Sequence, residues 1–312
     1  MNKVAKTKYL AIFLFAITFF LNVVVCAGPP LPTHSVEGNS GVFITSTAYL
    51  TNPAEKDAVF GQPSVSGTFV WMDKGGKDFE SIAVTENIWG NVELGYALER
   101  IGLGDWPDDV SKATAGTVSV DNHALMHNFN TRLMVIKEGG FDKDWMPAVT
   151  LGAHFKWNDG LNDIDKQTGG LCGTLGADHD SGVEFTAVAT KTITDWLPRP
   201  LIVSAGLRNG DGIHTGLLGF AGERRTTFEG SFIYFLTDKL LLASEYRQKS
   251  DLLNQCTLNG EHLIKAENDW WDIALAYVVN DRLTIAGGYA DFGNVLNHRE
   301  NNSWAIQVKY EF

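Results

Sequence analysis

The chain has 312 residues, with 25 lysines and arginines against 37 aspartates and glutamates, and its formal net charge at pH 7 is −12. A chain this acidic, with no basic stripe to neutralise phosphates, is not expected to bind nucleic acid. Glycine is frequent, aromatic residues make up 11% of the chain, and helical periodicity is scarce. This composition favours a β-rich protein with many turns.

Residues 1–27 have the pattern of a secretory signal peptide. Lysines at positions 3, 6 and 8 precede an almost continuously apolar run over 9–25, and small residues lead up to Ala27, after which we expect cleavage. Removing this segment leaves 22 basic residues against 37 acidic ones, a net charge of −15. A lipoprotein with Cys26 lipidated is the alternative, although Val25 suits it poorly. A retained anchor is disfavoured, because no other run approaches the ~20 apolar residues of a spanning helix.

Residues 28–62 differ from the rest in being rich in proline, glycine, asparagine and threonine. They contain one strand-like run, Gly41–Leu50. Three interpretations remain open for this stretch: a periplasmic arm, a plug inside a barrel, or an extra strand.

From Ser64 onward, segments of about ten residues alternate between apolar and polar side chains, as strands with two different faces do. Twelve strands are predicted between residues 63 and 312, with ten or fourteen as alternatives. Their approximate bounds are Ser64–Met72, Phe79–Ile88, Val92–Ile101, Asn128–Glu138, Ala148–Trp157, Gly182–Ile193, Leu201–Arg208, Thr226–Leu236, Lys239–Lys249, Trp270–Val279, Arg282–Asp291 and Asn302–Phe312.

Short and long connections alternate along these strands. Tight turns fall at Thr237-Asp238, at Asn280-Asp281 and near Gly90, and long loops follow the third, fifth, seventh and ninth strands. Bacterial outer-membrane barrels combine short periplasmic turns with longer outer loops. The pattern therefore predicts an all-β, antiparallel, up-and-down transmembrane barrel with both ends in the periplasm. A soluble sandwich or lipocalin-like fold is the alternative, but it does not require the alternation.

The last strand has one wholly apolar face and one mostly polar face. The apolar face carries Trp304, Ile306, Val308, Tyr310 and Phe312, and the other carries Ala305, Gln307, Lys309 and Glu311. This suits a strand between lipid and an aqueous lumen. Trp304, Tyr310 and Phe312 also look like the closing-strand signal that the barrel-assembly machinery recognises, so that machinery and outer-membrane lipid are the expected partners.

Several blocks, in order, resemble an uncharacterised bacterial family known as domain of unknown function 3034. They are Gly28–Leu31 with Glu37-Gly38, Glu93–Gly104, His127–Arg132, Lys156–Asp163, Ser204–Arg208, Gly216–Phe220, Glu245–Asp251 and Gln307–Phe312. The resemblance implies an exported protein of the bacterial outer membrane with a barrel fold. It implies no known activity and supplies no catalytic residues.

Many charged residues fall on the predicted inward faces. An arginine or lysine facing lipid at the bilayer midplane would cost ~2–4 kcal/mol, so these charges are expected to line the lumen. They are Glu93, Glu99, Arg132, His154, Lys156, Glu184, Arg208, Glu229, Glu245, Arg247, Asp272, Lys309 and Glu311. Either they line a solute path, or they pair and fill the lumen. For Glu245 and Arg247, with Glu229 and Asp272 as cross-strand neighbours, the same choice is between solute recognition and a salt-bridged belt.

Other chemistry has weaker support. Asp159, Asp163 and Asp165 are a weak Ca²⁺ candidate, since their spacing does not fit an EF-hand and a solvated acidic turn explains them. No Gly-x-Ser-x-Gly elbow occurs, and the loop residues His179 and His214, predicted to be exposed, are the nearest catalytic candidates. No cofactor is expected. Whether Cys172 and Cys256 pair is open.

Two functional hypotheses lead. The first is a narrow outer-membrane channel or transporter for a small solute, and the second is a structural or assembly barrel without transport. An outer-membrane enzyme of the lipase type is a third.

Overall fold

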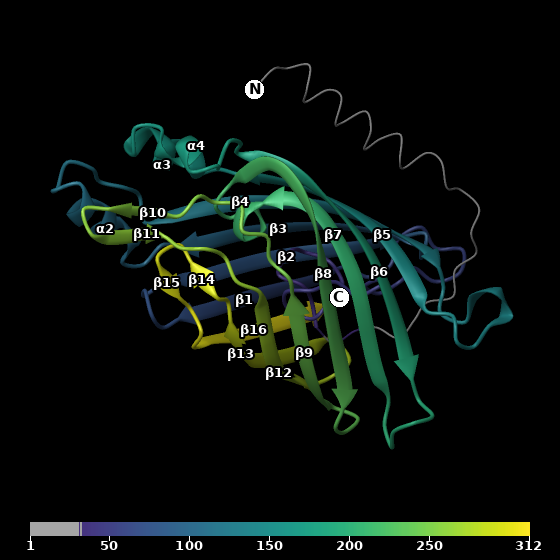
Figure 1. The fold of residues 1–312 in the computed structure, drawn as a ribbon. Helices are drawn as coiled ribbons and strands as arrows, with labels where there is room; N and C mark the ends of the chain where they lie inside the picture. Colours follow the sequence, from purple (N-terminus) through teal and green to yellow (C-terminus); the bar gives the residue numbers. More distant parts are fainter. Residues whose placement is uncertain (1–30, 32) are drawn as a thin grey trace, which may run out of the picture.

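The computed structural model describes residues 31 and 33–312, so the predicted signal peptide and its cleavage site lie outside the described residues. Twelve antiparallel strands form a closed barrel, in which each strand pairs with its neighbours in sequence and the first pairs with the last (Figure 1). The strands are β1 (Ser64–Met72), β2 (Asp78–Ile88), β3 (Val92–Gly102), β4 (His123–Ile136), β5 (Ala148–Asn158), β6 (Ser181–Ile193), β7 (Leu201–Gly212), β8 (Phe220–Phe235), β9 (Leu240–Arg247), β12 (Trp270–Val278), β13 (Leu283–Asp291) and β16 (Ser303–Glu311). The predicted twelve-strand, up-and-down barrel is confirmed.

Some strand bounds differ from the prediction. The fourth strand begins five residues earlier than predicted, at His123. The seventh strand ends later, at Gly212, and the eighth begins earlier, at Phe220. The connection between those two strands is consequently short, not the long loop that was predicted. A register shift between Gly210 and Gly212 lets Phe220 pair with Gly212 beyond the regular ladder, and alternation does not reveal such a bulge.

The two ends of the barrel are different. One end, here called the loop end, carries α2 (Trp106–Ala113), α3 (Leu161–Gln167), α4 (Leu171–Thr174), η2 (Ile213–Gly216) and two small hairpins, β10 (Cys256–Leu258) with β11 (Glu261–Ile264) and β14 (Asn294–Val295) with β15 (His298–Arg299). The three helices and the two hairpins lie toward the left of Figure 1. The opposite, turn end has short connections, except that residues 137–147 between β4 and β5 are longer and contain η1 (Gly140–Asp142). No helix among the described residues is long and apolar enough to cross a membrane.

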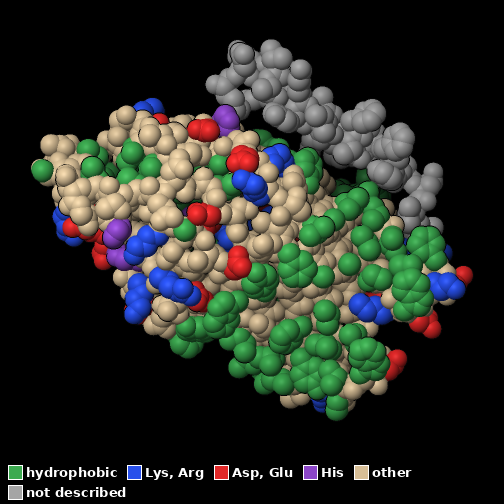
Figure 2. Space-filling view, viewed as in Figure 1, with side chains coloured by type: hydrophobic (Ala, Val, Ile, Leu, Met, Phe, Trp, Pro, Cys, Tyr) green, Lys and Arg blue, Asp and Glu red, His purple; other side chains and the backbone are tan. Residues whose placement is uncertain are grey.

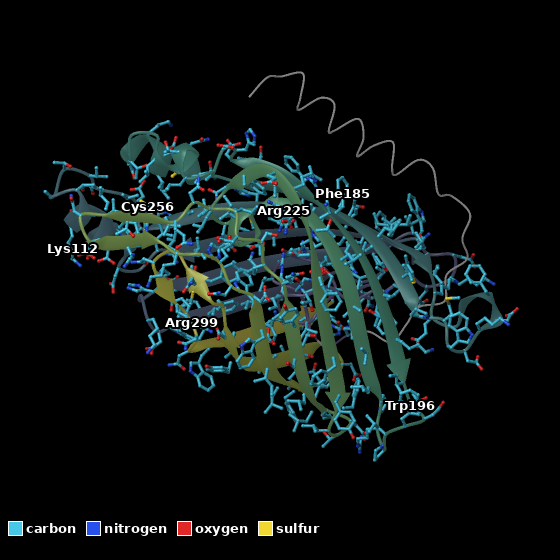
Figure 3. The ribbon with its side chains drawn as sticks, in the orientation of Figure 1. Lys112, Phe185, Trp196, Arg225, Cys256 and Arg299 are labelled. Atoms are coloured by element: carbon cyan, nitrogen blue, oxygen red, sulfur yellow. The ribbon has the colours of Figure 1, made fainter. Side chains whose placement is uncertain are left out.

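The outer face of the barrel is apolar. On β16, Trp304, Ile306 and Val308 are exposed whereas Gln307 and Lys309 are buried, as the alternation predicted. Figure 2 shows apolar side chains gathered on the barrel wall, and charged ones more toward the loop end. Trp196, which is 83% exposed, stands in the turn between β6 and β7 (Figure 3).

Residues 33–51, here called the inner segment, lie inside the barrel. All of them are buried except the half-buried Val36. The strand-like run Gly41–Leu50 does not add a strand to the barrel, because it is folded into bends and short bridges such as Gly41 with Ser46. Gly95 on β3 makes the close approach possible, since a Cβ there would lie 1.7 Å from the carbonyl oxygen of Gly38.

Candidate functional site

The charges predicted for the lumen all come to lie within the barrel. Each is at most 5% exposed, with the exception of the half-buried Glu311. They are Glu93, Glu99, Arg132, His154, Lys156, Glu184, Arg208, Glu229, Glu245, Arg247, Asp272 and Lys309. Most of their contacts are with the inner segment, which the sequence did not place.

One carboxylate of the inner segment, that of Glu37, lies at the centre of a cluster of cations. Arg208 donates to it from Nη2 at 2.8 Å, Lys156 from Nζ at 2.9 Å, and Arg247 from both terminal nitrogens at 3.2 Å. His154 Nδ1 is 3.9 Å away. Buried charges require such pairing, because loss of one partner leaves the other uncompensated at a cost of about 3–5 kcal/mol.

The three cations differ in what else they contact. Arg208 also binds Glu184 at 2.8 Å and Glu229 at 3.2 Å. Lys156 also binds Glu184, at 2.7 Å. The hydrogen bonds of Arg247 within the described chain go to the inner segment alone, namely to Glu37 and to the carbonyl of Ile44 at 3.0 Å. Arg247 is therefore the cation most dependent on the inner segment.

A second anchor joins the inner segment to β9. The Glu245 carboxylate accepts hydrogen bonds from the backbone amides of Phe43, Ile44 and Thr45 at 2.7–3.1 Å and from the Thr45 hydroxyl at 2.6 Å. Successive amides that converge on one anion form a backbone nest. The inner segment thus binds a carboxylate of the wall here, whereas at Glu37 the wall binds a carboxylate of the segment.

The predicted salt-bridged belt is only partly present. The strand registers place Asp272 opposite Glu245 and Glu229 opposite Arg247, as expected for cross-strand neighbours. Glu245 nevertheless binds backbone amides, and Glu229 binds Arg208 instead. Sequence reasoning missed the amide partners of Glu245 because it could not place residues 33–51 in the lumen. Arg208 was missed because it meets Glu229 diagonally across β7 and β8 and not directly opposite.

Further contacts hold the inner segment along its length. Gln307 on β16 accepts from the His34 amide at 3.1 Å and donates to the His34 carbonyl at 2.7 Å. Glu93 on β3 accepts from the amides of Ser40 and Thr51 at 3.0 and 2.7 Å. Arg132 donates to the Ser40 carbonyl at 3.1 Å. All of these contacts are noncovalent.

The η2 turn also reaches into the lumen from the loop end. Lys156 donates to the carbonyl of Thr215 at 2.8 Å, so one ammonium group joins η2 to the inner segment. His214 and Thr215 have positive φ angles of 43° and 66°, which neighbouring contacts must hold in place. The prediction that His214 is exposed is wrong: it is 2% exposed, and burial lowers its pKa to about 4, although Glu267 opposes that shift. His179 is exposed, as predicted.

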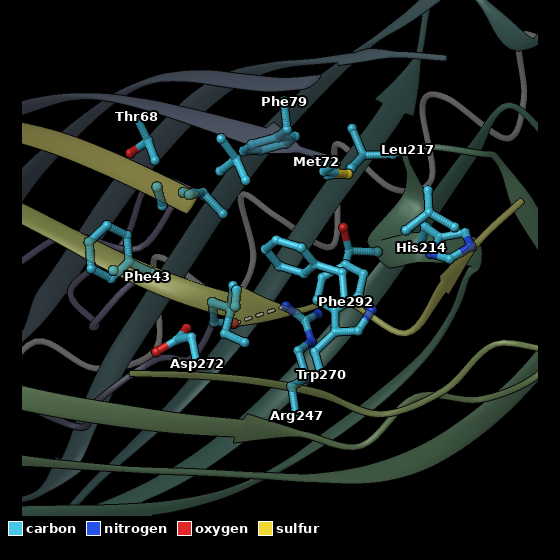
Figure 4. Close-up of a pocket in the computed structure, with 18 of the residues that line it drawn as sticks. Phe43, Thr68, Met72, Phe79, His214, Leu217, Arg247, Trp270, Asp272 and Phe292 are labelled. Atoms are coloured by element: carbon cyan, nitrogen blue, oxygen red, sulfur yellow. Dashed lines mark hydrogen bonds between the residues drawn. The ribbon is translucent and has the colours of Figure 1, made fainter. Parts of the chain in front are cut away.

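A cavity of about 60 Å³ lies between the inner segment, η2 and the wall (Figure 4). Its lining is mostly apolar and includes Phe43, Met72, Phe79, Leu217, Val295 and Phe292. Glu37 and Arg247 form part of its edge. Among the described residues, Trp270 Nε1 and His214 Nδ1, on side chains that also line it, have no hydrogen-bond partner. No sequence signal indicated this cavity, since its walls come from segments far apart in the chain.

The weaker candidates are dispersed. Asp163 pairs with Lys166 at 3.0 Å, and Asp165 accepts from the Cys172 amide at 2.8 Å. Within residues 33–312 no group of three or more His, Cys, Asp or Glu side chains could hold a metal ion. Cys172 and Cys256 are both free thiols, so the disulfide left open by the sequence is not formed.

Several solved structures are similar to the chain over most of their length. The structural match to the KdgM porin in complex with disordered oligogalacturonate covers 80% of this chain and 99% of the porin, at 8% sequence identity and a TM-score of 0.47. The match to the NanC porin covers 80% of this chain and 100% of the porin, at 10% identity and a TM-score of 0.47. The match to the outer membrane protein Omp33 of Acinetobacter baumannii covers 81% of this chain and 99% of that protein, at 7% identity and a TM-score of 0.42.

No curated protein matches the chain significantly. A family profile matches residues 32–309, which is most of the chain, and it has the description "Protein of unknown function (DUF3034)". The expected family resemblance is thereby confirmed, and the chain belongs to that family.

Proposed function

We propose that this protein is an outer-membrane channel for a small solute, in a state whose lumen is occupied by the inner segment. The location is supported by the apolar outer face of the closed barrel and by the contrast between its short turns and its elaborated loop end. A cleaved signal peptide would deliver the chain to that membrane.

The observation that carries the proposal is the way in which the lumen is filled. A barrel of about twelve strands lies between small barrels packed with side chains and the 16–18-stranded porins that leave an aqueous channel. Here the filling is a stretch of chain that precedes β1 and is held to the wall by hydrogen bonds, ion pairs and apolar packing. Withdrawal or rearrangement of that stretch would open a lumen with charged side chains on its wall. Water and a solute would enter that lumen.

A structural barrel without transport is the second candidate. It is favoured by the same buried network, since ion pairs that fill a lumen also rigidify it. In that case the inner segment would be a permanent part of the core.

Planar-bilayer recordings of the purified full-length protein separate the two candidates. A channel gives discrete current steps, with a low open probability in the wild type. Replacing Arg247 by glutamate should also move the reversal potential toward cation selectivity, whereas Arg225→Glu, at an exposed position at the start of β8, should not. A complete absence of steps across voltages and salt concentrations, even in variants that loosen the inner segment, would leave the structural barrel as the function.

A further inference from the structure

The environment of Glu37 is that of a bound anionic ligand, although the carboxylate belongs to the protein. Three wall cations, Lys156, Arg208 and Arg247, donate to its two oxygens at 2.8–3.2 Å. Charge-assisted hydrogen bonds from guanidinium groups are the usual means by which proteins recognise carboxylates. The carboxylate arrives on the inner segment, whereas all three cations are carried by barrel strands.

The three cations have unequal partners without Glu37. Two wall carboxylates, those of Glu184 and Glu229, contact Arg208 or Lys156 and neither contacts Arg247. Glu99 and Asp272 also line the adjoining cavity, with no ion pair to any of the three. When the inner segment is withdrawn, Arg208 and Lys156 keep Glu184 as a partner. Arg247 loses every hydrogen bond that the described chain gives it, because both of its acceptors, Glu37 and Ile44, belong to the inner segment. Water can then hydrate its guanidinium, but an anionic ligand would restore the charge-assisted hydrogen bonds that Glu37 provides.

The surroundings of Arg247 specify more than charge. Its guanidinium carbon is 6.0 Å from the centroid of the Trp270 ring, and both side chains line the apolar cavity (Figure 4). The Trp270 Nε1 donor has no partner in the described part of the chain. Phe79, Met72 and Phe292 supply the apolar wall. A ligand that fits would present a carboxylate to the cations and a small apolar body to this wall.

We propose that Lys156, Arg208, Arg247 and the adjoining cavity form a binding site for a small monocarboxylate with an apolar body, and that Glu37 is its tethered competitor. Monocarboxylates of this kind would be the solutes of the proposed channel. That they pass through the barrel rests on the proposed function, whereas their binding to the site does not. The apolar body of the ligand would occupy the cavity of about 60 Å³ together with the space that the Glu37 side chain gives up when it is displaced.

Equilibrium binding of radiolabelled benzoate and butyrate to the full-length protein in liposomes tests the site, with protein-free liposomes as background. Glu37→Gln removes the competing charge, so benzoate is expected to bind about 10-fold more tightly than to the wild type. Adding Arg247→Gln to that variant should weaken binding about 10-fold, and Arg247→Lys should restore part of it. Benzyl alcohol and butan-1-ol, the neutral counterparts, should not compete.

Glu300→Gln is the matched control. Glu300 is also a fully buried glutamate paired with a lysine, Lys77 at 3.2 Å, but it contacts neither the inner segment nor the three cations. Its replacement should leave benzoate binding unchanged. Equal benzoate affinity in Glu37→Gln and Glu300→Gln, or competition by benzyl alcohol, would overturn the proposal.

A measurement on the unaltered protein covers the case in which Glu37→Gln does not fold. Benzoate should raise the open probability of the wild type by displacing Glu37, and benzyl alcohol at the same concentration should not. Channels that open without any dependence on carboxylates would refute the site and leave the channel proposal standing. Benzoate binding that depends on Arg247 in a protein that never conducts would refute the channel and leave the site standing.

Discussion

The Glu245 carboxylate on β9 accepts hydrogen bonds from both the amide and the hydroxyl of Thr45, at 2.7 and 2.6 Å. The amides of Phe43 and Ile44 donate to the same carboxylate. Four donors on three consecutive residues thus depend on one wall side chain, which fixes the inner segment at this point.

Replacing Glu245 by alanine should therefore release the inner segment. The buried amides lose their acceptor, at a cost of about 1–3 kcal/mol for each group left unsatisfied. The open probability in planar bilayers should rise at least about 10-fold. Glu223→Ala, which removes an exposed carboxylate paired with Arg225 at 2.9 Å, is the control. If both variants open as rarely as the wild type, Glu245 does not hold the inner segment in place.

The barrel could be predicted from the sequence because apolar and polar side chains alternate along each strand, and the environments on the two sides of the wall impose this alternation. Lipid outside and polar groups inside impose an alternation that is local in sequence, as on β16. The inward side of Glu245 and Arg247, and their cross-strand neighbours, follow from that alternation and from the short turns.

The partners of those charges could not be predicted in the same way. Glu37 meets Arg247 across 210 positions of sequence, through a segment with no regular period. The burial of His214 has the same cause, since it follows from a turn at positive φ that folds inward. Neither the fold of residues 33–51 nor the direction of η2 is encoded by local alternation, so the cavity between them was not foreseen.

Acidification should loosen η2 through His214. Burial lowers the pKa of His214 to about 4 in the folded protein, with Lys249 and Lys77 acting in the same direction and Glu267 against it. The unfolded turn, with a pKa near 6.5, binds more protons between these values. The stability that neutral His214 contributes is thus complete above about pH 6.5 and is lost as the pH falls toward 4, on the order of 1.4 kcal/mol per pH unit.

Amide hydrogen exchange over residues 213–219 measures this effect. Protection factors, corrected for intrinsic rates, should be lower at pH 5 than at pH 7. His214→Asn removes the titrating group and keeps a side chain that tolerates positive φ, so its protection should not depend on pH in this range. Wild-type protection that is the same at both values would show that His214 does not control the turn.

The apolar outer face predicts a depth-dependent response to charge. Leu275, which is 49% exposed, faces outward near the middle of β12. Leu275→Arg should destabilise the protein in lipid vesicles by about 2–4 kcal/mol, whereas Trp196→Arg, in a turn at the barrel end, should cost about 0–1 kcal/mol. Urea unfolding of the two variants in vesicles gives both free energies. Equal, small losses would mean that the face around Leu275 does not contact hydrocarbon.

Removal of the Phe312 ring is expected to impair assembly in the outer membrane and not the stability of the folded barrel. The Tyr310 and Phe312 rings pack edge to face at 5.1 Å, and the Phe312 amide donates to the carbonyl of Pro63 at 3.2 Å. Phe312 is 54% exposed, so Phe312→Ala removes little packing. If this ring is the recognition signal, the folded, heat-modifiable fraction in the outer membrane should fall several-fold.

Refolding of the same variant without cellular machinery distinguishes recognition from stability. Purified Phe312→Ala should refold into lipid vesicles to the same extent as the wild type, because no assembly factor is present there. Phe141→Ala provides the control, since Phe141 is also an exposed aromatic residue at the turn end but does not belong to the closing strand. A variant that fails equally in cells and in vesicles would make Phe312 a stabilising contact of the barrel seam, and one that assembles normally in cells would remove it from the signal.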